Sequence, residues 1–89
     1  MTTHFGRSKN LARIRSISEA HYNVRVHPTE VDCTYQTVYD KDGTKYLQLT
    51  TYGSDSRKSG PKSSQTIQMD EHAALELAKI LLEQFKKTE

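Results

Sequence analysis

The sequence predicts an α+β fold: an antiparallel β-sheet of three to four strands packed by a C-terminal amphipathic α-helix, with a short N-terminal helix. Residues 31–39 and 46–52 alternate between two kinds of side chain, as strands do. Asp42-Gly43 between them is a favoured centre for a hairpin turn. Residues 70–88 carry apolar side chains at helical spacing. These patterns predict a hairpin covered by a helix.

Length and composition predict one domain with a small core. The chain has 89 residues, of which 34% are hydrophobic, and no Trp. We divide it into a basic helical arm (1–20), an antiparallel sheet (24–69) and a C-terminal helix (70–88). A domain of this size often gains stability by associating with a second copy, so we expect a homodimer. Lone Cys33 excludes an intramolecular disulfide, and we expect it to be a half-buried structural residue.

Two short elements are expected before the hairpin. Ser8 can cap a helix that runs to about Ala20, because the apolar residues between them recur at helical spacing. Val24–Val26 then alternates like a short strand. Pro28 cannot donate to a β-ladder, so the residues around it are expected to form a turn.

The hairpin is expected to have two chemically different faces. One side of the first strand holds Val31, Cys33, Tyr35, Thr37 and Tyr39, and the other holds Thr34, Gln36 and Val38. The second strand places Tyr46, Gln48, Thr50 and Tyr52 on one side, with Leu47, Leu49 and Thr51 on the other. With Asp42-Gly43 as a two-residue turn, Tyr39 lies opposite Tyr46, and a four-residue loop keeps the same residues on each face. The tyrosines of both strands should therefore share one face.

The last third of the chain predicts one more strand and the helix that covers the sheet. Residues 64–69 form the strand, and Asp70 caps the helix. The apolar stripe of this helix consists of Ala74, Leu75, Leu77, Ala78, Leu81, Leu82 and Phe85. We expect the helix to cover the aliphatic face that bears Leu47, Leu49 and Val38.

The opposite face is then expected to display four tyrosines, namely Tyr35, Tyr39, Tyr46 and Tyr52. A tyrosine ring can stack on an unpaired base, which contributes about 1–3 kcal/mol per base. The same rings can instead pack against the N-terminal helix or a second copy, with their hydroxyls in water. Both uses are compatible in a dimer that buries some rings and leaves others along a groove.

A basic loop, residues 54–63, precedes the last strand. It holds no apolar side chain to bury, and its cations are Arg57, Lys58 and Lys62. Such a segment is either a solvated connector or a place where phosphates bind. Arg13 and Arg15 extend the positive charge near the start of the chain, although the net charge is only +2. The uneven distribution of charge, more than its sum, favours a polyanionic partner.

Four features follow one another in the C-terminal half: a glycine-initiated strand, a Pro/Gly/Lys loop, a short strand and a final helix. They are Gly43–Tyr52, Gly60-Pro61-Lys62, Thr66–Met69 and the helix from Asp70. This order resembles the transcriptional positive cofactor four family of single-stranded-DNA-binding coactivators. The resemblance implies a curved four-stranded sheet, a homodimer built through the C-terminal helices, and binding of single-stranded or melted DNA. It also implies that Lys45, Arg57, Lys58 and Lys62 contact the nucleic-acid backbone.

Sequence patterns for catalysis, metals and membranes are missing. The His residues show no Cys-x-x-Cys or His-Glu-x-x-His spacing, and the chain has no Gly-x-Ser-x-Gly elbow or phosphate-binding Gly-rich loop. We therefore expect no enzyme, no metal and no cofactor. No stretch approaches the ~20 apolar residues of a membrane span, and no apolar run of a signal peptide is present. A soluble cytoplasmic protein is expected.

The residues favour a non-catalytic nucleic-acid-binding protein for single-stranded or melted DNA, acting in transcription or in regulation of a mobile element or phage. In this hypothesis the loop cations bind phosphates and the tyrosines stack on bases. The alternative is a protein-interaction adaptor or inhibitor that docks a partner on the tyrosine-rich face or on an edge strand. A purely structural accessory subunit is the third possibility.

Overall fold

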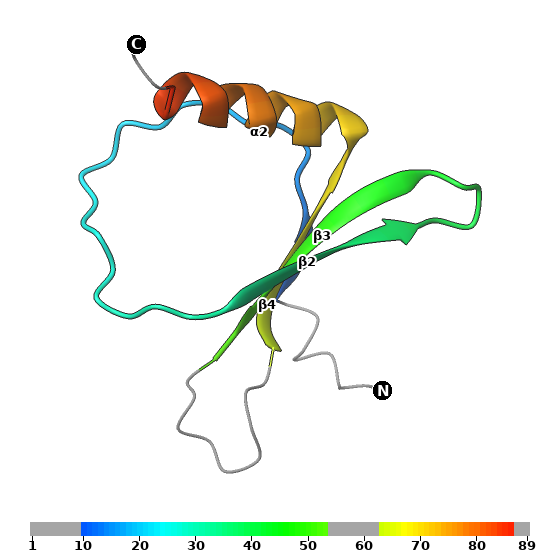
Figure 1. Cartoon of the computed structure of the whole chain (residues 1–89), viewed down its shortest axis with the longest axis horizontal. Helices are drawn as coiled ribbons and strands as arrows, with labels where there is room; N and C mark the ends of the chain where they lie inside the picture. The colour runs from blue at the N-terminus through cyan, green and yellow to red at the C-terminus, as the bar shows by residue number, and fades with distance from the viewer. Residues whose placement is uncertain (1–9, 54–62, 87–89) are drawn as a thin grey trace.

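The computed structural model describes residues 10–53 and 63–86. Its elements are β1 (Leu11–Arg13), β2 (Cys33–Tyr39), β3 (Lys45–Tyr52), β4 (Ser63–Asp70) and α2 (Glu71–Gln84). The strands form one sheet in the order β1-β4-β3-β2, and α2 lies at one end of it (Figure 1). β2, β3 and β4 are antiparallel neighbours, whereas β1 pairs with β4 in parallel. The expected α+β class, with a sheet packed by a C-terminal helix, is confirmed.

The N-terminal region differs from the expectation. Residues 10–20, the described part of the expected helix over 8–20, hold the strand Leu11–Arg13 and no helix. The run of apolar residues is short, and a short isolated helix is marginal in water. Pairing with the free edge of β4 satisfies the backbone groups instead. The strand expected at Val24–Val26 was also wrong, because residues 14–32 contain neither helix nor strand.

The hairpin between β2 and β3 turns through three residues, Lys41–Gly43. The Asp40 N–H donates to the Thr44 carbonyl (2.9 Å), and the Gly43 N–H donates to the Asp40 carbonyl (3.0 Å). Gly43 has a φ of 87°, a left-handed value that glycine adopts without steric cost. Hydrogen bonds from the Thr44 side chain and N–H lower the pKa of the Asp42 carboxyl, and its Oδ1 lies 3.0 Å from that N–H. The carboxylate therefore helps to hold the turn.

An odd number of turn residues moves the register by one position, which changes the faces of the hairpin. Tyr39 lies opposite Lys45, and Val38 lies opposite Tyr46. The face toward α2 carries Cys33, Tyr35, Thr37, Tyr39, Lys45, Leu47, Leu49 and Thr51. The other face carries Thr34, Gln36, Val38, Tyr46, Gln48, Thr50 and Tyr52. The expectation that all four tyrosines share one face was therefore wrong.

Helix α2 begins directly after β4 and folds back over one end of the sheet. The Asp70 carboxylate accepts the Ala73 N–H (2.9 Å), which is the expected N-cap. Met69 and Ala73 form the buried core, with 2% and 3% of their surface exposed. The helix lies on the face that bears Leu47 and Leu49, as expected, although Val38 belongs to the other face. Cys33, expected to be half-buried, is exposed.

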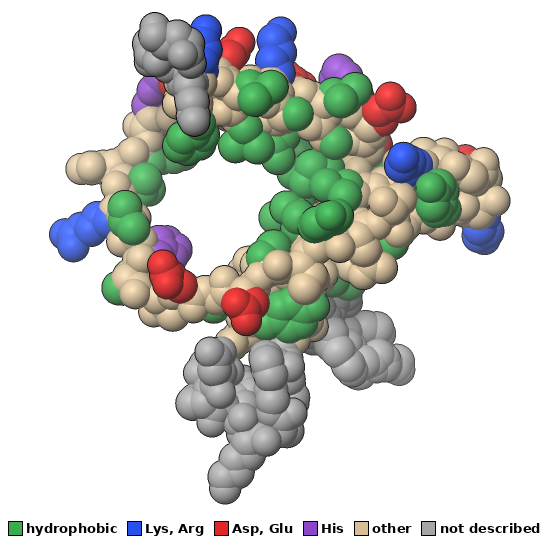
Figure 2. Space-filling model, in the orientation of Figure 1, with side chains coloured by type: hydrophobic (Ala, Val, Ile, Leu, Met, Phe, Trp, Pro, Cys, Tyr) green, Lys and Arg blue, Asp and Glu red, His purple; other side chains and the backbone are tan. Residues whose placement is uncertain are grey.

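The segment between β1 and β2, residues 14–32, is called the strap here. It passes behind α2 and returns to β2 in a wide arc (Figure 1). Figure 2 shows an opening between the strap, α2 and the sheet, with hydrophobic side chains around its rim. Among the described residues, several large apolar side chains are exposed, including Tyr22, Val24 and Val26 of the strap and Leu75, Leu82 and Phe85 of α2.

Candidate nucleic-acid interface

The side of the sheet that α2 leaves free is mostly polar, with Leu11 and Val38 as apolar members, and we call it the polar face. Because side chains alternate along a strand, the pairing of the four strands determines which residues lie there. They include Arg13, Thr34, Gln36, Tyr46, Gln48, Thr50, Tyr52, Thr66 and Gln68. The polar face therefore combines a cation with aromatic rings, amides and hydroxyls.

Arg13 lies over the ring of Tyr46. Its guanidinium carbon is 5.4 Å from the ring centroid, and its Nη1 donates to the Tyr46 hydroxyl at 3.2 Å. The short strand β1 makes this contact possible, because it aligns Arg13 with Gln68 of β4, and β4 in turn neighbours Tyr46 on β3. A cation over an aromatic face is attracted by the ring quadrupole. The pair holds a positive charge in place while the arginine remains exposed to solvent.

Two glutamines lie beside this pair. Gln68 Nε2 donates to Gln48 Oε1 at 2.8 Å, and Gln48 Nε2 donates to the buried Thr50 hydroxyl at 3.3 Å. These bonds fix the orientation of both amides across β3 and β4. Each amide nitrogen carries two hydrogens, so each glutamine retains a donor that can meet a ligand. Oriented amides of this kind can form hydrogen bonds with the edges of nucleobases.

A hollow of about 400 Å³ lies on the β1 side of the polar face. It is lined by Leu11, Ala12, Arg13, Gln48, Thr66 and Gln68. Arg13 and the glutamine pair thus border the same space. At the other end of β3, the Tyr52 hydroxyl and Thr34 Oγ1 share a hydrogen bond of 3.1 Å. Tyr46 and Tyr52 are six residues apart on one strand, so their rings define a path of about 20 Å along the face.

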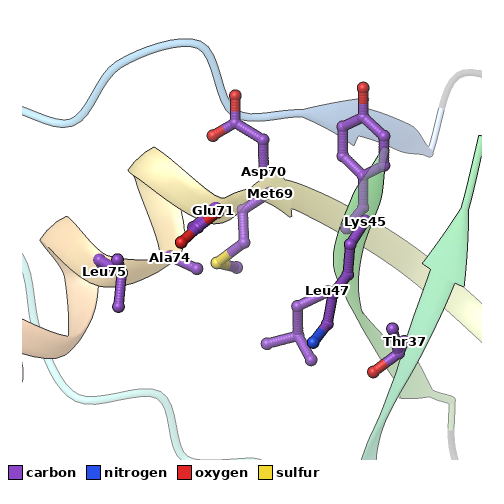
Figure 3. A pocket seen from close by; sticks show the side chains of 9 residues that line it. Thr37, Lys45, Leu47, Met69, Asp70, Glu71, Ala74 and Leu75 are labelled. Atoms are coloured by element: carbon purple, nitrogen blue, oxygen red, sulfur yellow. The ribbon is translucent and has the colours of Figure 1, made fainter. Parts of the chain in front are cut away.

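Asp70 is the acid that the register assigns to the polar face, directly opposite Tyr46. Its carboxylate accepts the Ala73 N–H at the start of α2. In Figure 3 the Asp70 side chain points away from Leu47, Met69 and Ala74. Its charge is partly offset by the helix N-terminus, which favours an anion at this position. The Arg13 charge therefore faces no acid on the neighbouring strands other than this capping group.

The structure separates the residues that the sequence assigned to nucleic-acid binding. On the polar face lie Arg13, Tyr46 and Tyr52. On the face toward α2 lie Tyr35, Tyr39 and Lys45. Arg15 is exposed on the strap, two residues beyond Arg13. Outside the described residues lie Arg57, Lys58 and Lys62.

Sequence reasoning missed Gln48 and Gln68 as site residues. Both occupy the middle of a predicted strand, and Gln48 shares the side of Tyr46. The alternation within β3 was therefore enough to place Gln48 on the same face as Tyr46. The pairing of Gln48 with Gln68 depends on the register between β3 and β4. A long connection such as 54–62 does not fix a register from sequence, in contrast to a tight hairpin turn.

Comparison of the chain with protein-family models, with curated proteins and with solved structures finds no match. Residues 10–53 and 63–86 contain no group of three or more His, Cys, Asp or Glu side chains placed to hold a metal ion. Within the same ranges, no helix has the length and apolar character needed to cross a bilayer. What the polar face can bind is inferred from its own side chains.

Proposed function

We propose that this chain is a non-catalytic nucleic-acid-binding protein whose ligand, single-stranded DNA, lies along the polar face. One observation carries the proposal: Arg13 is held on the Tyr46 ring beside the oriented Gln48–Gln68 amide pair, at the rim of one hollow. A cation can meet a phosphate, an aromatic ring can stack with a base, and amides can bond to base edges. These are the contacts that an unpaired strand requires.

The basic loop supplies the second part of the proposed path. It connects the end of β3 to the start of β4, so its cations follow Tyr52 in the chain. In this proposal Arg57, Lys58 and Lys62 bind phosphates beyond the Tyr52 end of the face. The resemblance to the transcriptional positive cofactor four family supports the same ligand and a role in transcription. Lys45, which that resemblance also implies, lies on the other face and has no role in this path.

We further propose that the binding unit is a homodimer. The exposed apolar residues of the single chain support this proposal, because water-exposed apolar surface of this extent marks an interaction site. They include Leu75, Leu82 and Phe85 of α2 and Tyr22, Val24 and Val26 of the strap. Two copies also place two polar faces in one particle, which raises avidity for a long strand.

A second candidate function has its own supporting observation. Tyr35 and Tyr39 are 76% and 66% exposed on β2, a seven-residue strand at the edge of the sheet. An open edge with exposed rings suits a protein-interaction adaptor that pairs with an extended segment of a partner protein. Salt separates the two functions, because phosphate contacts weaken steeply with salt whereas binding to aromatic rings persists.

The test compares two tyrosines of the same hairpin. Fluorescence anisotropy with a labelled single-stranded oligonucleotide should show that Tyr46→Leu weakens binding about 5- to 150-fold, the equivalent of one lost base stack. Tyr39→Leu is the matched control, since it removes a ring from the other face and should bind like the wild type. Equal losses in both variants, or no loss in either, would refute the assignment of the polar face.

A further inference from the structure

The hollow on the β1 side of the polar face has a polar end and an apolar end. Arg13 of β1 pairs with Gln68 of β4, and two residues earlier Leu11 pairs with Thr66. All four residues line the hollow. Because two residues of a strand span about 7 Å, the cation and the amide belong to one end of the hollow, and the other pair belongs to the opposite end.

The apolar end consists of the Leu11 side chain and the methyl group of Thr66. Leu11 is 56% exposed, whereas Thr66 is half-buried. A single exposed leucine is ordinary on a protein surface, but this one borders a space that also contains hydrogen-bonding groups. Sites for small ligands combine such groups, and the volume of about 400 Å³ lies within their usual range of about 300–1,000 Å³.

The polar end can form hydrogen bonds with one edge of a base. The bond from Gln68 Nε2 to Gln48 Oε1 uses one amide hydrogen of Gln68. That bond leaves the second amide hydrogen and Oε1 of Gln68 for a ligand. One donor and one acceptor match the Watson–Crick edge of any unpaired base, so these bonds do not distinguish one base from another. Selection of a base therefore depends on the apolar end.

We propose that the hollow binds a thymine base, and that Leu11 and Thr66 are the residues that select it. The inference rests on the proposed function and specifies which base the polar face prefers. Gln68 pairs with O4 and N3–H of the base, and the C5 methyl group beside O4 contacts Leu11 and Thr66. Among the four ordinary DNA bases only thymine carries a methyl group, which proteins recognise by apolar contact.

Arg13 has a separate role at the same site. Its guanidinium is held on the Tyr46 ring and borders the hollow. A phosphate carries no information about the base attached to it, so a contact between Arg13 and a phosphate adds affinity for every sequence. Affinity and base preference are thus assigned to different residues, and one can be removed without the other.

Thymine and uracil differ only in the C5 methyl group, so a comparison of the two isolates the proposed contact. Fluorescence anisotropy measures the affinities of labelled deoxythymidine and deoxyuridine homopolymers of equal length for the wild type, Leu11→Ala and Thr66→Ser. The wild type should prefer the deoxythymidine polymer. Leu11→Ala should reduce this preference about three- to fourfold, the effect of one buried methyl group. Thr66→Ser, which removes a methyl group and keeps the hydroxyl, should change the preference in the same direction.

Two further variants serve as controls. Leu81→Ala removes a leucine of α2 that is 48% exposed, and it should leave the preference unchanged. Gln68→Met should weaken the binding of both polymers equally, by about 5- to 150-fold, because thymine and uracil share O4 and N3–H. Circular dichroism checks that each variant folds.

The outcomes separate this inference from the proposed function. No binding of either polymer by the wild type would overturn both. Binding with the same preference in the wild type, Leu11→Ala and Thr66→Ser would overturn the thymine site and leave single-strand binding standing. Wild-type affinity of Gln68→Met for both polymers would also overturn the thymine site, since no hydrogen bond to the base edge would then be involved.

Discussion

Gly43 shows how far one residue can determine this structure. Its φ of 87° lets the chain close a three-residue turn, and that turn sets the register of the hairpin. The register then decides that Tyr46 and Tyr52 share the polar face while Tyr35 and Tyr39 lie on the face toward α2. A two-residue turn would place all four rings together. The composition of the candidate site therefore depends on backbone geometry at a position that does not belong to it.

Replacement of Gly43 tests this dependence. No atom lies within 4 Å of a Cβ built on Gly43, so the cost of Gly43→Ala comes from the left-handed backbone alone. The free energy of unfolding should fall by about 1–2 kcal/mol, measured by urea denaturation. Gly43→Asn is the matched control and should lose less, because Asn tolerates this conformation better. An alanine variant as stable as the wild type would contradict the strained-turn account.

At the residue scale, the sequence predicted the alternation of side chains within each strand better than their pairing across strands. The alternation of tyrosines, threonines and leucines in β2 and β3 was correct within each strand. The prediction of which residues of β2 and β3 share a face was wrong. Turns of two or four residues put the same residues on one face, whereas the three-residue turn shifts β3 by one position and exchanges its two faces. Arg13 lies on the polar face, but its contact with Tyr46 depends on β1, which the sequence had predicted as helix.

At the scale of elements, the junction between β4 and α2 is determined by local contacts. The strand ends at Asp70 and the helix begins at Glu71, without a linker. The Asp70 carboxylate satisfies one of the free N–H groups of the first turn. Since the junction directs α2 back toward Leu47 and Met69, the cap also sets which face of the sheet is left polar.

Removal of this cap should weaken the domain measurably. Asp70→Ala is expected to lower the free energy of unfolding by about 1 kcal/mol, measured by chemical denaturation. Asp70→Ser keeps an acceptor for the Ala73 N–H and should retain most of the stability. Glu83→Ala, an exposed acid near the other end of the helix, controls for the loss of charge. If Asp70→Ser and Asp70→Ala proved equally destabilised, the cap would not be the cause.

Strong local signals predicted β2, β3, β4 and α2 to within a few residues. Asp-Gly turn chemistry, period-two alternation and a 3.6-residue stripe all act within short windows of sequence. β1 was missed for a physical reason: a three-residue strand exists through its pairing with the edge of β4, far along the chain. The strap gave a weak alternating pattern at Val24–Val26, yet within residues 10–53 and 63–86 that segment belongs to no strand.

At the scale of the whole molecule, the described part of the chain buries few hydrophobic residues. Buried hydrophobic residues in the described ranges are limited to Met69 and Ala73, while Leu75, Leu82 and Phe85 of α2 and Tyr22, Val24 and Val26 of the strap are exposed. Their apolar character was visible in the sequence, but amphipathic periodicity does not say whether a helix side meets its own sheet or another chain. In the proposed homodimer, a second copy covers part of this apolar surface and leaves the polar face of each sheet open to a ligand.

The charge distribution of the molecule gives a prediction for the basic loop. Neutralising Arg57, Lys58 and Lys62 together should weaken single-strand binding and make its dependence on salt shallower. Each lost phosphate contact removes about 0.7 from the slope of log K against log salt, so the three together remove about 2. Anisotropy titrations over a salt series measure this slope. An unchanged slope would exclude the loop from the binding path.

In the proposed function, single-stranded DNA binds across the polar face, at Arg13 and Tyr46. The most direct test is the affinity of wild type and Arg13→Gln for a labelled single-stranded oligonucleotide over a salt series. Arg13→Gln should bind more weakly, with a slope of log K against log salt shallower by about 0.7, whereas Arg25→Gln on the strap should match the wild type. Wild-type affinity and slope in Arg13→Gln would contradict the claim.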